Sequence, residues 1–296
     1  MLKMHRAHHE PCADSFDEAT PRNGGRALDQ AVRRSPMSDR RLTLSIDEGV
    51  ARICLIRPDA ANTIDLVFAE EFETAAEACV EGRARVVLVT AVGRQFCGGG
   101  DLKSFADQAD LGAHLEDVTQ HFHAGIVTFV EMDAPVVVAV QGAVAGAGLG
   151  LVGAADIVVA GKSATFVMAY TRLGLTPDGS SSWFLSRHVG LRRALDLTLT
   201  NRVLSADEAL AWGLITRLVA DDQVLKEAES IIEPLAKGPT AAYGASARLL
   251  RAATGNTLRT QLRQEADALV DRARAVDGVE GVRSFVERRS ANFRGD

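Results

Sequence analysis

The sequence lacks several features that would each indicate a class of protein. No apolar run approaches the roughly 18 residues that a bilayer-spanning helix needs, so we expect no membrane anchor. No long basic run is present, and the 296 residues carry a formal net charge of -6. This balance argues against nucleic acid as the main partner.

Cysteine is also scarce. The chain has 4 cysteines, Cys12, Cys54, Cys79 and Cys97, which lie far apart. They form no CxxC pair and show no metal-binding spacing with histidine, so we predict no metal site and a reduced, cytoplasmic protein. Cys97 could be proposed as a nucleophile because it lies beside glycines, but no base is close in sequence. Packing among small residues is the favoured interpretation.

The first 36 residues show no apolar periodicity. They contain no apolar core of a secretory signal, and acidic residues such as Glu10 and Asp14 argue against a transit peptide. Met37 is followed almost at once by patterned sequence. We therefore interpret residues 1–36 as a disordered leader or an added segment that is not part of the fold.

The whole chain is 47% hydrophobic, which is enough for a large core. Polar and apolar residues alternate around Asp47–Gly49, which predicts a hairpin over residues 41–56. Helical spacing predicts a helix over 65–81, and short β-branched runs predict strands at 86–90, 136–140, 157–160 and 165–168. We expect a variable loop at 106–113 and a helix from about 115 to 132. From residue 222 onward the pattern is helical.

One stretch organises the chain, PVVVAVQGAVAGAGLGLVGAADI at 135–157. A buried strand ends at Gln141 and Gly142, and Gly146, Ala147 and Gly148 then open a helix of small residues. The first N–H groups of a helix lack partners inside it and can bind a ligand oxygen. The alternative is tight helix–sheet packing that needs small residues for contact alone.

A second glycine-rich corner, RQFCGGGDLK at 94–103, also follows a predicted strand. Two such corners could each supply one N–H to a single developing negative charge. That layout is an oxyanion hole.

These blocks together resemble the crotonase (enoyl-CoA hydratase/isomerase) superfamily, from about Leu42 to the C-terminus. The resemblance is carried by RPDAANT at 57–63, QFCGGGDL at 95–102, VAVQGAVAGAG at 138–148 and AADIVVAGKSATFVMAYTRLGLTPD at 154–178. It continues in LTNRVLSADEALAWGLITRLV at 199–219 and EGVRSFVERRSANF at 280–293.

The resemblance implies an α/β fold, a spiral of β-β-α repeats over residues 37–220, and a helical trimerisation region over 221–296. It implies homotrimers or hexamers acting on acyl-CoA thioesters, with coenzyme A as part of the substrate and no other cofactor. The oxyanion donors carried over are the N–H groups of Gly98 and Ala147. The positions expected to contact substrate are Ala60, Asn62, Gly99, Gly100, Asp101, Leu102 and Tyr170. Arg288 and Arg289 match basic residues that approach the CoA phosphates.

The chain departs from the hydratase pattern, in which two glutamates add water across a 2-enoyl double bond. Gly150 and Tyr170 stand at the two glutamate positions, and neither can do that work. A carboxylate instead occurs at Asp178. The resemblance to 1,2-epoxyphenylacetyl-CoA isomerases gives Asp178 an acid–base role, whereas 4-chlorobenzoyl-CoA dehalogenases use an aspartate there as a nucleophile and a histidine near His123.

Structural roles compete with these assignments. Asp178 precedes Gly179 and Ser180 and could be a turn or N-cap residue, and His123 lies on a predicted helix where a structural histidine is common. We expect Tyr170 to line the pocket, Asp101 to cap a helix and Lys103 to be solvated.

The sequence therefore predicts an acyl-CoA enzyme, most simply an enoyl-CoA isomerase that uses Asp178. The alternatives are a hydratase of fatty or aromatic acid degradation, a haloaryl-CoA dehalogenase, and an acyl-CoA binder without catalysis.

Overall fold

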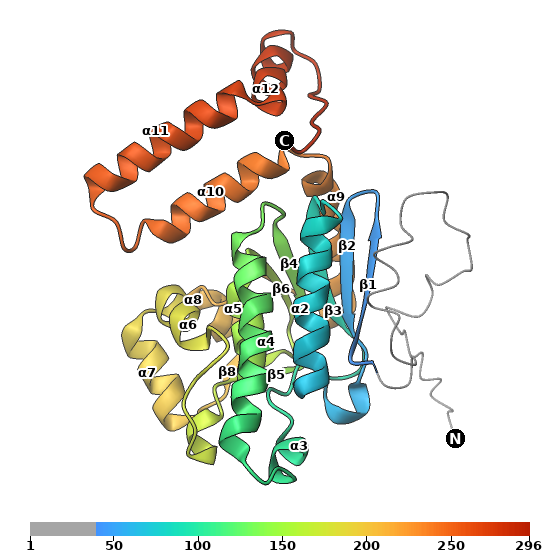
Figure 1. Ribbon diagram of the computed structural model, residues 1–296, viewed down its shortest axis with the longest axis vertical. Coiled ribbons are helices and arrows are strands. Elements are labelled where there is room, and N and C mark those ends of the chain that lie inside the picture. The colour runs from blue at the N-terminus through green and yellow to red at the C-terminus, as the bar shows by residue number, and fades with distance from the viewer. Residues whose placement is uncertain (1–39) are drawn as a thin grey trace, which may run out of the picture.

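The computed structural model describes residues 40–296 as an α/β body from which an arm of helices projects (Figure 1). The expected leader at 1–36 lies outside the described residues. The strands are β1 (Leu42–Asp47), β2 (Val50–Leu55), β3 (Val86–Ala91), β4 (Val136–Val140), β5 (Ala143–Ala145), β6 (Ile157–Gly161), β7 (Thr165–Val167), β8 (Leu204–Ser205) and β9 (Arg217–Val219). The helices of the body are α2 (Leu66–Glu81), α3 (Leu102–Ala106), α4 (Leu111–Glu131), α5 (Ala147–Ala154), α6 (Ser181–Val189), α7 (Leu191–Thr200), α8 (Ala206–Trp212) and α9 (Val224–Ala236).

The main sheet has the strand order β1-β2-β3-β4-β6-β9. The β1–β2 hairpin is antiparallel, as predicted, and the other neighbours run parallel. Both faces are covered, which is why the central strands are continuous runs of apolar residues. Val87 and Val89 pack in the core that includes α2 and α4, while Val86 and Leu88 pack against α9.

Helices α2 and α4 lie side by side over one face of this sheet (Figure 1). The Asp65 side chain accepts the Phe68 N–H and begins α2, close to the predicted start. The Phe72 ring meets Phe122 and Phe129 of α4 at centroid distances of 5.5 and 4.9 Å. These aromatic contacts fix α4 beside α2.

The predicted start of α4 was one turn late. The helix begins at Leu111 because the Asp110 carboxylate accepts the Ala113 N–H at 3.0 Å. Of the expected loop at 106–113, only residues 107–110 lie between the helices, because Ala106 ends α3 and residues 111–113 begin α4. This correction matters because α4 carries part of the candidate site.

A second sheet, β5-β7-β8, carries α5. Its strand β5 was not predicted, since three residues between two glycines give no periodicity. Val144 of β5 is bridged to Cys97, and the Ala145 N–H donates to the Cys97 carbonyl at 2.9 Å. This small sheet therefore holds the two glycine-rich corners next to each other.

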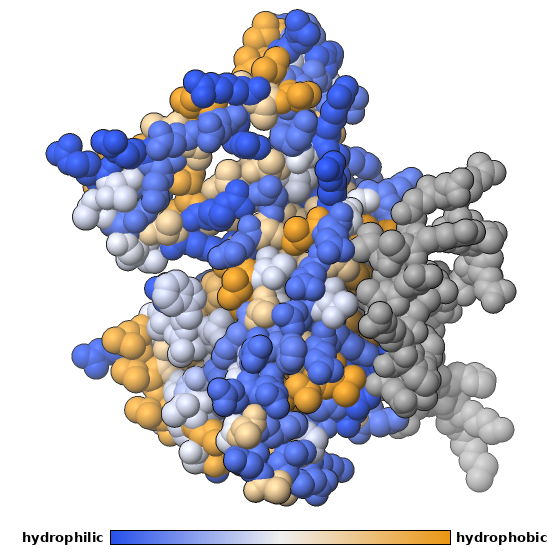
Figure 2. Space-filling view, viewed as in Figure 1, coloured by the Kyte–Doolittle hydropathy of each residue, from blue (hydrophilic) through white to orange (hydrophobic). Residues whose placement is uncertain are grey.

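The helical arm comprises α10 (Thr240–Ala252), α11 (Leu258–Arg274) and α12 (Val276–Val286). Helix α9 packs on the main sheet, so the projecting region begins with α10 rather than at residue 221. Arg248 and Arg251 of α10 pair with Asp133 and Asp156 of the body. No residue of α11 is buried within this chain, and its apolar residues lie on the surface (Figure 2). Among residues 40–296, no helix is long and apolar enough to cross a membrane.

Candidate active site

The two glycine-rich corners meet at the end of the main sheet. A Cβ added to Gly99 would lie 2.8 Å from the Ala145 carbonyl oxygen, and one added to Gly148 would lie 2.9 Å from the Cys97 carbonyl oxygen. No side chain larger than hydrogen fits at either position without displacing backbone. The packing interpretation of the small residues is therefore confirmed, and this tight packing also brings the two corners together.

The structure contradicts Gly98 as an oxyanion donor. The Gly98 N–H donates to the Ala61 carbonyl at 2.8 Å and is not available to a ligand. Ile64 pairs with this corner through the Gly99 carbonyl and the Asp101 N–H, both at 2.8 Å. Gly100 lies between these bonds, so its N–H points away from Ile64. No described residue accepts that N–H, and Gly100 lines the adjacent cavity.

Ala147 is the first residue of α5, where a helix leaves its N–H groups without internal acceptors. No acceptor for the Ala147 N–H occurs within residues 40–296. Ala147 also lines the cavity, as expected. Gly100 and Ala147 thus form the pair of free donors that Gly98 and Ala147 were predicted to form.

The cavity in front of these donors has a volume of about 290 Å³. Its wall is mostly apolar and comes from both corners, from α3 and α4, and from the segment 169–178. It is lined by Ile64, Gly98, Gly99, Gly100, Leu102, Phe105, Leu115, Val118, Thr119, Phe122, Gly146, Ala147, Ala169, Tyr170, Leu173, Leu175, Thr176 and Asp178. Tyr170 and Asp178 are the ionisable side chains in this lining.

Asp178 lies between two partners in this cavity wall. The Tyr170 hydroxyl donates to Asp178 Oδ1 at 2.6 Å, and His123 Nε2 lies 3.6 Å from Asp178 Oδ2. Burial raises the pKa of Tyr170, and the neighbouring Asp178 carboxylate raises that pKa further. Tyr170 is therefore a protonated donor that orients the carboxylate. The sequence placed Tyr170 in the pocket but gave no signal for this contact.

The turn that carries Asp178 occupies the space beside Gly150. A Cβ on Gly150 would lie 1.8 Å from the Gly179 carbonyl oxygen. A glutamate at residue 150 therefore cannot coexist with this turn. Asp178 also has the predicted turn role, since its carbonyl accepts the Ser181 N–H at 3.0 Å.

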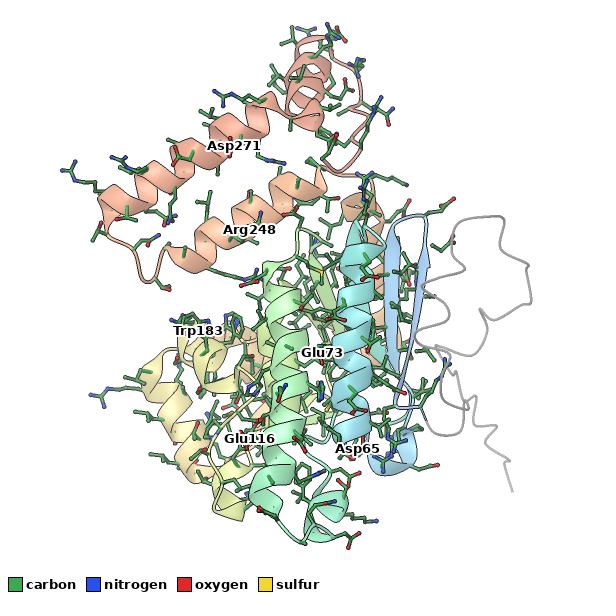
Figure 3. The ribbon with its side chains drawn as sticks, viewed as in Figure 1. Asp65, Glu73, Glu116, Trp183, Arg248 and Asp271 are labelled. Carbon is green, nitrogen blue, oxygen red and sulfur yellow. The ribbon has the colours of Figure 1, made fainter. Side chains whose placement is uncertain are left out.

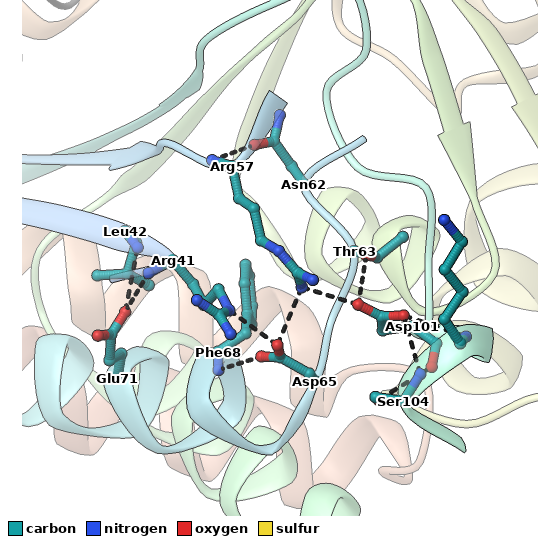
Figure 4. A network of polar contacts seen from close by, with 11 residues as sticks. Arg41, Leu42, Arg57, Asn62, Thr63, Asp65, Phe68, Glu71, Asp101 and Ser104 are labelled. Atoms are coloured by element: carbon teal, nitrogen blue, oxygen red, sulfur yellow. Dashed lines mark hydrogen bonds and ion pairs between the residues drawn. The ribbon is translucent and has the colours of Figure 1, made fainter. Parts of the chain in front are cut away.

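Two of the residues predicted to contact substrate are structural (Figure 4). The buried Asn62 side chain donates to the carbonyls of Val92 and Gln95, each at 3.0 Å. Asp101 caps α3, as predicted, and binds Arg57 at 2.8 Å. Burial opposes ionisation of Asp101, but hydrogen bonds from the Ser104 N–H and the Arg57 guanidinium lower the pKa of its carboxyl. Neither side chain lines the cavity.

The remaining predicted residues lie in different places. Ala60 ends a turn of 3₁₀ helix at Pro58–Ala60 outside the cavity lining, whereas Leu102 lines the cavity and is 49% exposed. Lys103 is exposed, as expected. Arg289 pairs with Glu280, and the arm that carries Arg289 lies at the opposite end of the molecule from α3 (Figure 1). Cys97 is buried outside the lining, and burial raises the pKa of its thiol to about 11.

Comparison with known proteins agrees with this geometry. The family model described as "Enoyl-CoA hydratase/isomerase" matches residues 45–296. A Rhodobacter capsulatus protein named "Probable enoyl-CoA hydratase" is 37% identical over 260 residues, which cover 88% of this chain and 100% of the relative. The 1,2-epoxyphenylacetyl-CoA isomerase of Escherichia coli is 35% identical, with 84% of this chain and 97% of the relative covered.

The fold agrees as well. The crystal structure of an enoyl-CoA hydratase from Polaromonas sp. JS666 superposes with a TM-score of 0.80 at 29% identity, covering 86% of this chain and 99% of that one. Its likeness confirms the expected α/β spiral with C-terminal helices. The chain therefore belongs to the enoyl-CoA hydratase/isomerase family of the crotonase superfamily.

Proposed function

We propose that this protein is an enoyl-CoA isomerase in which Asp178 moves a proton along the acyl chain of a CoA thioester. The observation that carries the proposal is the presence of one carboxylate, Asp178, in an apolar cavity that also presents the free N–H groups of Gly100 and Ala147. The space for a second carboxylate at residue 150 is filled by the Gly179 carbonyl. A single carboxylate suffices for isomerisation, because it can take a proton from one carbon and, once protonated, deliver a proton to another.

The proposed reaction starts with a 3-enoyl thioester. The Asp178 carboxylate takes a proton from C2, and the electron pair of that C–H bond moves into the thioester carbonyl. The resulting dienolate oxygen accepts hydrogen bonds from Gly100 and Ala147, which act as the oxyanion hole. The Asp178 side chain is 32% exposed, so its carboxylic acid can exchange its proton with solvent before it delivers a proton to C4 and the double bond moves to C2–C3.

Tyr170 and the apolar wall support this role for Asp178. Tyr170 occupies Oδ1 of the carboxylate and leaves Oδ2 for proton transfer. Apart from Asp178, no charged side chain lines the cavity formed by the described residues. An uncharged acyl group fits such a cavity.

The proposal includes a homotrimer or hexamer and no cofactor beyond the CoA of the substrate. Large apolar residues on the arm support assembly, since Leu258, Leu269 and Phe285 are 75%, 72% and 86% exposed. Arg288 and Arg289 could meet CoA phosphates only through such an assembly, because the cavity of the same subunit lies at the opposite end of the folded molecule.

Dehalogenation of a haloaryl-CoA is the second candidate, and the 3.6 Å separation of His123 Nε2 and Asp178 Oδ2 favours it. In that reaction, Asp178 would attack the ring carbon, displace halide, and be freed when water hydrolyses the aryl ester. The reaction requires chloride release from 4-chlorobenzoyl-CoA and a transient increase in protein mass.

The test incubates the protein with a 3-enoyl-CoA and, separately, a 2-enoyl-CoA in deuterated water. We expect double-bond migration with deuterium uptake and no mass gain from water. Asp178→Asn should lower kcat by about 10²-fold or more while retaining binding of the thioester. Addition of water would instead establish hydration, and full activity of Asp178→Asn would overturn the role of Asp178. A thioester that stabilises the protein without turnover would indicate a non-catalytic binder.

A further inference from the structure

The turn that carries Asp178 has an unusual backbone. Gly179 and Ser180 are consecutive residues in the left-handed region, with φ of 57° and 67°. Such a conformation is uncommon for serine and persists only where surrounding contacts hold it. The position of the Asp178 carboxylate therefore depends on what holds this turn.

Two sides of the turn are fixed by α5 and α6. The Gly179 carbonyl lies against Gly150, and Ser180 Oγ lies 3.3 Å from the Gly150 carbonyl oxygen. Ser181, at the start of α6, donates its hydroxyl to the Asp178 carbonyl at 2.6 Å. All of these contacts involve carbonyl groups of the turn or of α5. None of them involves the Gly179 N–H at the centre of the turn, which has another partner.

That partner is His123 on α4. The Gly179 N–H donates to His123 Nε2 at 3.1 Å. A ring nitrogen accepts a hydrogen bond only through its lone pair, so Nε2 carries no proton here and the neutral ring holds its proton on Nδ1. The His123 side chain is 46% exposed, which lets protons from solvent reach the ring.

Protonation of His123 changes the partner of Nε2. An Nε2–H can no longer accept the Gly179 N–H, and the Asp178 carboxylate, with Oδ2 at 3.6 Å, is an acceptor close to it. The cationic ring then attracts the carboxylate that serves as the base. Tyr170 stays on the other oxygen of that carboxylate.

Glu73 of α2 and Arg187 of α6 are engaged elsewhere. Glu73 of α2 pairs with His121 at 2.5 Å, and α2 lies along the other side of α4 (Figure 3). Helix α5 has no ionisable side chain, and Arg187 of α6 lies over the Trp183 ring. Asp178 is thus the charged group that the described contacts place at His123.

We propose that His123 is a positioning residue whose neutral imidazole holds the Gly179 peptide, and with it the Asp178 base, and whose protonation redirects Nε2 to the Asp178 carboxylate and stops turnover. The catalytic part of this inference rests on the isomerase function proposed above. The exchange of hydrogen-bond partners does not depend on that function.

The kinetic test compares the pH dependence of kcat/KM for a 3-enoyl-CoA in the wild type, His123→Gln and His123→Ala. The Oε1 atom of glutamine can accept the Gly179 N–H but does not titrate. We expect His123→Gln to retain activity within a fewfold at pH 8 and to lose it at lower pH than the wild type. His123→Ala should lose roughly 10-fold in kcat at every pH, with little change in KM. An acid limb that is unchanged in His123→Gln, or full activity of His123→Ala, would overturn the proposal.

A second readout separates this proposal from the proposed reaction. The sequence contains two Asp–Gly peptide pairs, Asp178–Gly179 and Asp277–Gly278. Labelling aspartate carbonyls with ¹³C and glycine amides with ¹⁵N therefore isolates two amide signals, and Asp277→Asn, which removes the labelled aspartate of the other pair, identifies the one from Gly179. We expect the chemical shift of the Gly179 amide to change with pH in two steps in the wild type. The step caused by protonation of His123 should be missing in His123→Gln, which leaves one step. Identical titrations in both proteins would overturn the exchange of partners, whatever reaction the enzyme catalyses.

Discussion

The carbonyl oxygen of Gly179 packs against Gly150 so closely that a Cβ on residue 150 would lie 1.8 Å from it. The Asp178 turn and a side chain at residue 150 thus compete for one space. This relationship links the absence of a side chain at residue 150 to the presence of Asp178 in the cavity wall.

The first prediction concerns this contact. Gly150→Ala should displace the Asp178 turn, lower kcat by about 10²-fold or more, and cost about 3 kcal/mol of unfolding free energy. Gly255→Ala is the matched control, because its Cβ would meet only the Ala252 carbonyl oxygen, at 3.9 Å. Activity assays and thermal melts measure both effects. Normal activity and stability of Gly150→Ala would show that the turn does not require this contact.

The second prediction concerns the hydrogen bond between Tyr170 and Asp178. Tyr170→Phe keeps the ring in the wall but removes a donor to a charged acceptor, so kcat should fall about 10- to 100-fold with a smaller change in KM. Steady-state kinetics measures kcat and KM separately and so tests this prediction. An unchanged kcat would mean that Tyr170 only lines the cavity.

Tyr170 also predicts a dependence of stability on pH. Its pKa is raised in the folded state by burial and by the Asp178 carboxylate, so the folded protein keeps a proton that the unfolded chain releases above about pH 10. The unfolding free energy should therefore fall as pH rises above about 10, and it should fall less steeply in Tyr170→Phe. The chain has 2 tyrosines, and tyrosinate absorbance at pH 11 should lack the contribution of Tyr170 until the protein unfolds.

Local patterns predicted much of the fold. The β1–β2 hairpin, the valine-rich strands and the start of α2 follow from residues close in sequence, such as Asp65 and its partner Phe68. The error at Gly98 arose because the direction of each N–H in an extended corner depends on Ala61 and Ile64, which pair with it from a distant segment. The contacts of His123 and Tyr170 with the Asp178 turn likewise depend on packing between α4, α5 and α6. No local pattern encodes them.

The third prediction tests the Ala147 donor. Ala147→Pro removes the N–H at the first position of α5, where proline is compatible with a helix. The helix should form, but loss of one oxyanion donor should lower kcat by about 10²- to 10³-fold. Leu191→Pro is the matched control, since Leu191 also follows a glycine at the first position of a helix and is 65% exposed. Equal activity in the two variants would remove Ala147 from the site.

The fourth prediction concerns Cys97. Because burial raises the pKa of its thiol to about 11, Cys97 stays protonated near neutral pH and cannot act as a nucleophile. Cys97→Ala should keep kcat within about threefold and lose some stability, since the side chain is fully buried. A loss of kcat beyond about 10²-fold, without unfolding, would reopen the assignment of Cys97 as a catalytic group.

The fifth prediction concerns the apolar surface of the arm. Phe285 is 86% exposed and Val282 is 71% exposed on α12, and α11 exposes Leu269 in the same arm. Apolar residues of this size contribute most to stability when a partner removes them from water, so we expect the arm to pack on other copies of the chain. Light scattering after size exclusion should give a trimer or hexamer for the wild type. Phe285→Glu should shift the population toward monomer, because an assembled interface would bury an unpaired charge. Helix content should be retained, since Phe285 is not part of the core of its own chain. A monomeric wild type, or a Phe285→Glu variant of unchanged mass, would show that α12 does not hold copies together.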